Sequence, residues 1–188
     1  MAVSTSSTAL RLFWDAAGVT PARRWVAIAG PVFAVGVGQF FGPYVISVLL
    51  GQIQRGQVSW QSSWPLVAGY LLSQVLGTVV GWRVVLWASW TMGGAGMQLV
   101  FQRVFAHLTK QSVAFHSNRF SGALVSQTNK LIGAFEMFWD TIVWALMPIA
   151  TGILVATAVL AFGAWPDALF LFTMSGAFIA VAVLATRR

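Results

Sequence analysis

Four side chains in the chain could take part in acid–base chemistry: His107, His116, Glu136 and Asp140. The two acids are four residues apart, which places both carboxylates on one face of a helix. Paired acids can act as general acid and base. The histidines are nine residues apart with no carboxylate between them, and a metal site needs three or four ligands. We therefore expect exposed histidines and structural ion pairing of the acids, and a membrane-embedded enzyme that uses all four is an open alternative.

Other reaction types have no residue pattern to support them. Ser117, Ser121 and Ser126 have no base and orienting acid nearby in the sequence. The chain has no Cys, which excludes disulfides, a thiol nucleophile and thiolate metal sites. It also lacks the G-x-x-x-x-G-K-[ST] and G-x-G-x-x-G patterns of phosphate-binding loops. The sequence thus predicts no catalytic, cofactor-binding or metal-binding residue.

The composition indicates that lipid surrounds most of the chain. Only 8% of the residues are charged and 58% are hydrophobic, whereas an ordinary soluble domain has about 25% charged residues. The net charge of +7 could suggest a nucleic-acid partner, but the basic residues lie at the ends of apolar runs. Nucleic-acid-binding proteins gather them on one face or stripe. We expect an all-α membrane protein with lipid, and no nucleic acid, as a partner.

Four apolar runs are long enough to cross a hydrocarbon core, which takes about 20 helical residues. They predict spans at about residues 25–50, 65–87, 141–163 and 167–186. Nine of the eleven Lys and Arg share one side if the N-terminus, residues 103–140 and the C-terminus lie together. Because Lys and Arg are in excess on the cytoplasmic side, we expect a multi-pass protein of the plasma membrane with both termini cytoplasmic.

The N-terminal segment should form a short helix in the inner membrane interface. Residues 1–8 are small and polar, and are expected to be a disordered tail. Residues 9–18 predict the helix, and Gly18 can end it. Apolar residues at helical spacing give it one face, and an i,i+4 ion pair lies on another side. The apolar face consists of Leu10, Phe13, Trp14 and Ala17. The ion pair consists of Arg11 and Asp15.

Proline and glycine divide the first two spans. Pro31 and Pro43 could kink the first span, and Pro65 is suited to the first position of the second helix, after an outer loop over 51–65. Gly77 and Gly81 are four residues apart, which allows a close helix approach or is ordinary membrane glycine. Further along, Gly93-Gly94-Ala95-Gly96 could mark a bend or a tight contact near the inner interface.

The second helix should continue far beyond the membrane. From Leu99 the sequence becomes amphipathic, and no Pro or Gly occurs between Gly96 and Gly122. One helix over about residues 65–113 would be roughly 70 Å long, against a hydrocarbon core of about 30 Å. Residues 122–140 repeat the amphipathic character, so 88–140 is expected to be an intracellular loop of two long helix extensions.

The polar turn inside this loop carries a resemblance to a known family. Phe115-His116, Gly122, Leu124 and Ser126 fit the pattern F-[FHY]-x-x-x-x-x-G-x-L/I-x-S/N. The segment resembles the first intracellular loop of ABC exporter transmembrane domains, where this pattern lies on a short coupling helix. The helix at 9–18 is similar to the N-terminal elbow helix of that family. Asn129-Lys130 stands where many members have Asn-Asp, so an acidic residue of the family is absent here.

The resemblance implies a function as part of an ATP-driven exporter. Residues 1–24 would be the cytoplasmic N-terminus and 25–188 a partial transmembrane domain with the first four of six helices, from a truncated or split gene. ATP and Mg would bind a nucleotide-binding domain in a missing or partner segment, and a second transmembrane half would complete a dimer. The coupling-helix contacts would be Phe115, His116, Ser117, Asn118, Arg119 and Phe120.

Two further points accompany this hypothesis. Gln39, Gln74 and Arg83 are polar residues within apolar spans, and we expect them to line the translocation cavity. A charged side chain inside a span is costly, so Arg83 should face a cavity, a partner or the protein interior. The alternative to an exporter is a complete four-helix membrane protein that scaffolds or assembles a complex and has no transport role.

Overall fold

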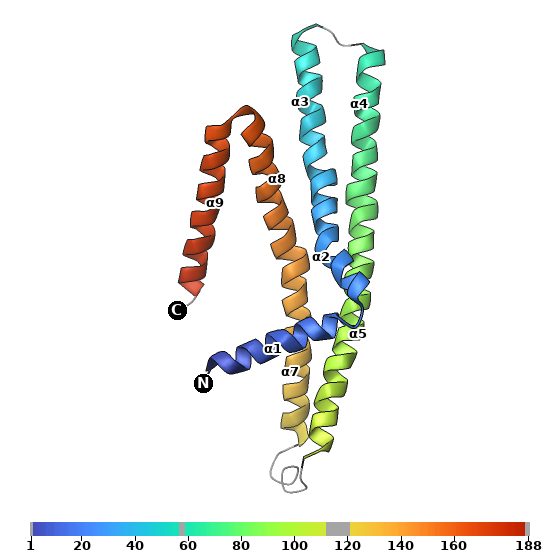
Figure 1. Cartoon of the computed structure of the whole chain (residues 1–188). Helices are drawn as coiled ribbons and strands as arrows, with labels where there is room; N and C mark the ends of the chain where they lie inside the picture. Colours follow the sequence, from blue (N-terminus) through green and yellow to red (C-terminus); the bar gives the residue numbers. More distant parts are fainter. Residues whose placement is uncertain (1, 57–58, 112–120, 187–188) are drawn as a thin grey trace. The chain divides into compact units, whose positions relative to one another are not determined.

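The computed structural model describes residues 2–56, 59–111 and 121–186, and this part of the chain is helical without a strand (Figure 1). The expected all-α class is therefore confirmed, whereas the proposed coupling helix at 115–120 lies outside the described residues. In chain order the elements are α1 (Ala2–Ala17), α2 (Pro21–Val35), η1 (Gly36–Phe40), α3 (Phe41–Gln54), α4 (Trp60–Ser73), η2 (Gln74–Gly81), α5 (Trp82–Thr109), α7 (Ser121–Asp140), η3 (Thr141–Leu146), α8 (Met147–Gly163) and α9 (Trp165–Thr186).

Successive elements join into four helices that are long and apolar enough to cross a membrane. They run over Pro21–Gln54, Trp60–Thr109, Gly122–Gly163 and Trp165–Thr186. Each contains one of the four predicted spans. Most of their apolar surface is exposed within the chain, as expected for helices that pack in lipid or on further helices. The chain is a membrane-embedded, multi-pass protein.

The prolines of the spans do not interrupt these helices. Two of the three π-helical segments end shortly before a proline: η1 precedes Pro43 and η3 precedes Pro148. A proline removes one backbone donor and its ring clashes with the carbonyl four residues earlier. A wider π-helical turn at this point is a common way to relieve such a clash while the helix continues.

The outer loop between the first two spans is shorter than the sequence predicted. The first helix continues to Gln54, and the second starts at Trp60, not at Pro65. Ser59 is the reason, because its hydroxyl accepts a bond from the Ser62 amide at 3.2 Å while the Ser62 hydroxyl accepts from the Ser59 amide at 3.2 Å. This reciprocal capping box nucleates the helix before the proline is reached.

The chain divides into two compact units. One comprises Gly30–Arg83 and Leu146–Arg188. In it α3 pairs with α4, and α8 pairs with α9 as a second helical hairpin (Figure 1). The other comprises Met1–Ala29 and Val84–Ala145 and holds α1, α5 and α7, which position the predicted intracellular turn.

The first two spans meet at glycines in the first of these units. A Cβ atom added at Gly77 would lie 2.6 Å from the Cα of Gly38 and 3.1 Å from the carbonyl oxygen of Ala34. One added at Gly81 would lie 3.2 Å from the Cβ of Ala34. Of the two readings of these glycines, the close helix approach is therefore the correct one. Gln74 Nε2 donates to the Gly38 carbonyl oxygen at 2.7 Å across the same contact.

Candidate functional site

The candidate site is the helical hairpin of α5 and α7, because it carries the predicted cytoplasmic turn between its ends (Figure 1). The two helices touch where Gly96 faces Phe135, a fully buried ring. A Cβ atom at Gly96 would lie 2.9 Å from Cε1 of Phe135, so only glycine leaves room for the ring. The Gly93–Gly96 run thus marks a tight contact, and not the bend that was its other interpretation, because α5 continues unbroken through it.

The short helix α1 packs on this hairpin through aromatic rings. The ring centroid of Phe13 lies 5.6 Å from that of Phe135 and 5.7 Å from that of Phe138. Trp139 donates from Nε1 to the Phe13 carbonyl oxygen at 3.4 Å and stacks on Trp14 at 5.7 Å between centroids. Side chains from α7 therefore contact Phe13 and Trp14 near the C-terminal end of α1.

Part of the predicted apolar face of α1 packs against the chain. Phe13 and Ala17 are buried and Ala16 joins them, whereas Leu10 is 49% exposed and Trp14, which stacks on Trp139, is 42% exposed. On an interfacial helix such exposed apolar residues can lie against lipid.

The expected disordered tail is also wrong, since α1 begins at Ala2. Helix nucleation is costly and propagation is cheap. The turns around Phe13 pack on α7, so the extension of the helix from them toward the N-terminus costs little. The predicted end of this helix is confirmed, because Gly18 follows its last residue and donates from its amide to the Asp15 carbonyl oxygen at 3.0 Å.

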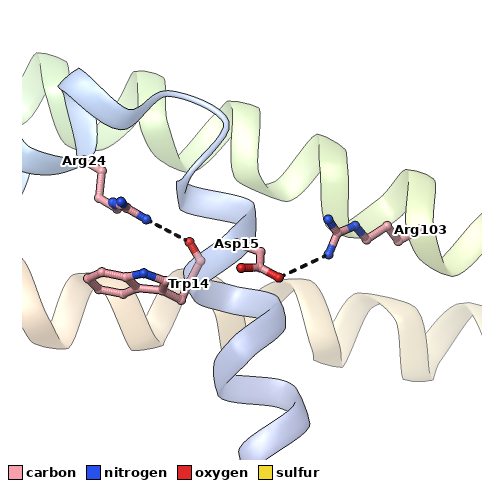
Figure 2. A network of polar contacts seen from close by, with 4 residues as sticks. All are labelled: Trp14, Asp15, Arg24 and Arg103. Atoms are coloured by element: carbon pink, nitrogen blue, oxygen red, sulfur yellow. Dashed lines mark hydrogen bonds and ion pairs between the residues drawn. The ribbon is translucent and has the colours of Figure 1, made fainter.

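Arg24 fixes the other side of α1 (Figure 2). Its guanidinium carbon lies 4.4 Å from the ring centroid of Trp14 and 5.5 Å from that of Trp25. Arg24 Nη1 also donates to the Trp14 carbonyl oxygen at 3.3 Å. Arg24, close to the start of the first span, is thereby joined to α1 by a cation–π contact and by a hydrogen bond to a carbonyl oxygen in the last turn of that helix.

Asp15 forms a different ion pair from the one predicted. Its Oδ2 lies 4.0 Å from Nη1 of Arg103 on α5, so among the described residues the acid pairs across helices and not with Arg11 (Figure 2). The two side chains are 61% and 48% exposed. At that exposure an ion pair contributes about 0–1 kcal/mol, less than the aromatic contacts.

We expect Arg24→Ala to loosen α1 while the spans stay folded. Loss of the cation–π contact and the hydrogen bond should destabilise α1 docking by about 1–2 kcal/mol. Hydrogen exchange of the α1 amides in detergent or nanodiscs would then be about tenfold faster. Arg103→Ala is the matched control, since it removes only the exposed ion pair, and equal acceleration by both variants would contradict the assignment.

The two predicted carboxylates do share a face. Glu136 and Asp140 line a hollow of about 320 Å³ between α5 and α7, next to Ser89 and Met92. Both acids are exposed, and no histidine is among the lining residues. His107 does not line this hollow, and its Nε2 lies 3.2 Å from Nε2 of Gln111. Within the described residues no group of three metal-binding side chains occurs, and His116 lies outside those residues.

The three residues predicted to line a cavity have different surroundings. Gln39 and Arg83 are exposed. Gln74 Nε2 donates to the Gly38 carbonyl oxygen, and Gln74 Oε1 accepts from Thr78 Oγ1 at 3.1 Å. A hollow of about 770 Å³ between the first two spans is lined by other, mostly apolar residues. The cavity assignment of the three residues stays a prediction, as do the coupling contacts at 115–120, which lie outside the described residues.

Sequence reasoning missed the residues that hold the hairpin and α1 together. Phe135 and Trp139 are four residues apart and thus share one face of α7, which is a readable signal for a buried aromatic stripe. Gly96 across from Phe135 and Arg24 across from Trp14 could not be paired from the sequence, because such contacts depend on which helices are neighbours.

The chain was compared with known proteins in three ways. No family model, no curated protein and no solved structure matches the chain.

Proposed function

We propose that the chain is the transmembrane portion of an ATP-driven ABC exporter and that the turn at 115–120 contacts a nucleotide-binding domain. The observation that supports this most is the length of the helices on either side of the turn. Trp60–Thr109 has 50 residues and Gly122–Gly163 has 42. At 1.5 Å per residue these are about 75 and 63 Å long, against about 45 Å for a bilayer with its headgroups.

Helices of this length suit the transmission of movement from the cytoplasm to the spans. The Gly96–Phe135 contact and the docking of α1 make α5, α7 and α1 one packed unit. A push on the turn would move this unit as a body. In the exporter family, closure of two nucleotide-binding domains supplies that push, and the spans then switch the cavity from inward-open to outward-open.

Arg83 supports a second transmembrane half. The residue is exposed, and within the described ranges no acidic side chain pairs with it. An unpaired charge on a spanning helix is costly in lipid, so such residues face a cavity or a partner. With a second half in place, Gln39 and Arg83 would face the translocation pathway.

The first test is the genomic DNA downstream of this coding sequence. The proposal expects the reading frame, or a neighbouring gene, to encode a nucleotide-binding domain with a G-x-x-x-x-G-K-[ST] motif. Absence of such a sequence would reject the exporter and favour a four-helix scaffold protein.

In the assembled transporter we expect Phe115→Ala with Arg119→Ala to uncouple ATP hydrolysis from transport. Removal of an aromatic and an arginine from a contact surface typically weakens it by about tenfold or more. Transport into vesicles should fall by that factor while ATP hydrolysis continues. Gln127→Ala, at an exposed position of α7, is the control. Unchanged coupling in the double variant would count against the proposal.

The purified chain alone should not hydrolyse ATP, because its sequence has no phosphate-binding loop. Measurable hydrolysis that disappears on substitution of His107, His116, Glu136 and Asp140 together would instead support a membrane-embedded enzyme.

A further inference from the structure

The hollow of about 320 Å³ between α5 and α7 is lined by two of the four acidic residues of the chain. Glu136 and Asp140 line it from α7, and both are exposed. Gly93 and Gly94 line it from α5, and a Cβ atom at either glycine would meet nothing within 4 Å. We call this feature the acidic hollow; it exists because the two glycines carry no side chain to fill it.

The two carboxylates of the acidic hollow have no basic side chain beside them. Within the part of the chain that the structure describes, the one ion pair joins Asp15 to Arg103. The ion pairing expected for Glu136 and Asp140 is therefore absent from the described residues. Like charges four residues apart on a helix repel each other, so a bound cation would stabilise this pair of acids.

Aromatic rings surround the carboxylates. Trp90, Phe135 and Trp139 all line the hollow. Trp90 is 73% exposed, so most of its ring is accessible to a ligand. The face of an aromatic ring attracts a cation within about 6 Å, and Trp does so most strongly. Aromatic rings of this kind recognise quaternary ammonium groups in other proteins, and the two carboxylates add negative charge to the same site.

A buried hydroxyl on the wall of the acidic hollow lacks a partner. Ser89 lines the hollow from α5, one helical turn before Gly93. Its Oγ atom is buried and forms no hydrogen bond with any described residue. Buried polar groups are nearly always hydrogen-bonded, so an unpaired one needs an explanation. A ligand that carries a hydroxyl group beside its cationic nitrogen would supply the missing partner.

The donor atoms of the hollow do not suit a metal ion. Calcium takes about six to eight oxygen ligands, and zinc takes at least three protein ligands. The described residues contain no group of three metal-binding side chains, and most side chains around the two acids are aromatic, aliphatic or thioether groups. A metal ion would lose water ligands here without replacing them, whereas alkyl groups on an ammonium nitrogen gain from burial against an apolar wall.

We propose that the acidic hollow binds a small organic ammonium cation, with its nitrogen between the Glu136 and Asp140 carboxylates and the Trp90 ring. The volume of about 320 Å³ is at the lower end of the range of about 300–1,000 Å³ for small-molecule sites, which fits a choline-sized group. The acids directly precede the predicted span over 141–163, next to tryptophans of the kind that mark the membrane–water interface. A dissolved cation and the ammonium headgroup of a lipid both reach this depth. This inference does not rest on the exporter function.

The test measures binding of labelled choline to the full chain by equilibrium dialysis. The chain is held in a nonionic maltoside detergent, which carries neither a charge nor an ammonium group. The matched probe is the neutral carbon isostere of choline, in which a tert-butyl group replaces the trimethylammonium group. We expect choline to bind at least about tenfold more tightly than the isostere. Equal binding of both probes, or binding of neither, would overturn the proposal.

The charges and the ring can be removed separately. Glu136→Gln with Asp140→Asn keeps the size of both side chains, and it should weaken choline binding at least about tenfold. Both side chains are exposed and unpaired among the described residues, so the fold should be retained. Trp90→Leu should weaken binding about two- to fivefold. Asp167→Asn, exposed and outside the hollow, should leave binding unchanged.

Gly93→Leu tests the position of the ligand without changing a charge. The new side chain would fill the hollow and should abolish choline binding. Leucine favours a helix over glycine and meets open space at this position, so loss of the fold is not expected. Gly176→Leu in α9 also meets open space and is the control. Undiminished binding in Gly93→Leu or in the double acid variant would overturn the proposal.

Competition with lipid identifies the source of the ammonium group. Displacement of choline by phosphatidylcholine, but not by phosphatidylglycerol, would assign the acidic hollow to a lipid headgroup. Displacement by neither lipid would assign it to a dissolved cation. Both results agree with the proposal. Equal displacement by the two lipids would show that acyl chains occupy the hollow, and this result would overturn it.

Discussion

Gly77→Val is expected to separate the first two spans. The added Cβ atom would lie 2.6 Å from the Cα of Gly38 and 3.1 Å from the Ala34 carbonyl oxygen. Both neighbours are backbone, so no rotamer change can make room and the helices must move apart. Overpacking of this kind costs about 3 kcal/mol or more.

Separation would also break the hydrogen bond from Gln74 to the Gly38 carbonyl oxygen. Interhelical bonds in membranes contribute about 0.6–1.7 kcal/mol. We expect the two losses together to lower the Tm of the detergent-solubilised chain by about 10 °C, and Gln74→Leu alone to lower it by a smaller amount.

Gly69→Ala is the matched control on the same helix. Its Cβ atom would be 3.6 Å from the Phe41 ring, an ordinary contact distance, and alanine favours the helix by up to about 1 kcal/mol over glycine. Its Tm should be unchanged or higher. A Gly77→Val chain as stable as Gly69→Ala would show that the two spans do not approach at Gly38.

The sequence predicted the helices better than their contacts. Long apolar runs, an uninterrupted amphipathic stretch and Gly18 were sufficient for the four spans, for the helix that reaches Thr109 and for the end of α1. These features depend on local composition and on spacing along one helix. The start of the second helix at Trp60 was missed because Pro65 is an equally valid local signal, and the capping box of Ser59 and Ser62 decided between them.

Contacts between helices required the three-dimensional arrangement. Gly77 and Gly96 both lie in glycine pairs or runs that the sequence marked, yet Gly93 and Gly94 have open space around them. The sequence could not tell the packed glycine from its neighbours, because the difference is the presence of Phe135 on another helix. The same limit explains why Asp15 was paired with Arg11 on its own helix and not with Arg103.

Gly96→Ala is expected to destabilise the α5–α7 hairpin. Gly94→Ala, two residues earlier and on another face of α5, is not expected to do so. The new methyl at 96 would lie 2.9 Å from Cε1 of the fully buried Phe135. Overpacking costs about 1–3 kcal/mol, more than the gain of up to about 1 kcal/mol in helix propensity. Gly94 has no atom within 4 Å of such a methyl, so Gly94→Ala should be neutral or stabilising.

The obstacle at Gly96 is a side chain, unlike the backbone at Gly77, and this makes rescue possible. Phe135→Leu removes the ring edge that meets the methyl, so in that background Gly96→Ala should become neutral or stabilising. Thermal melts of the four chains form a double-mutant cycle, and we expect a coupling energy of about 2 kcal/mol. Additive effects would show that the methyl at 96 meets something other than Phe135 and that the hairpin packs in another register.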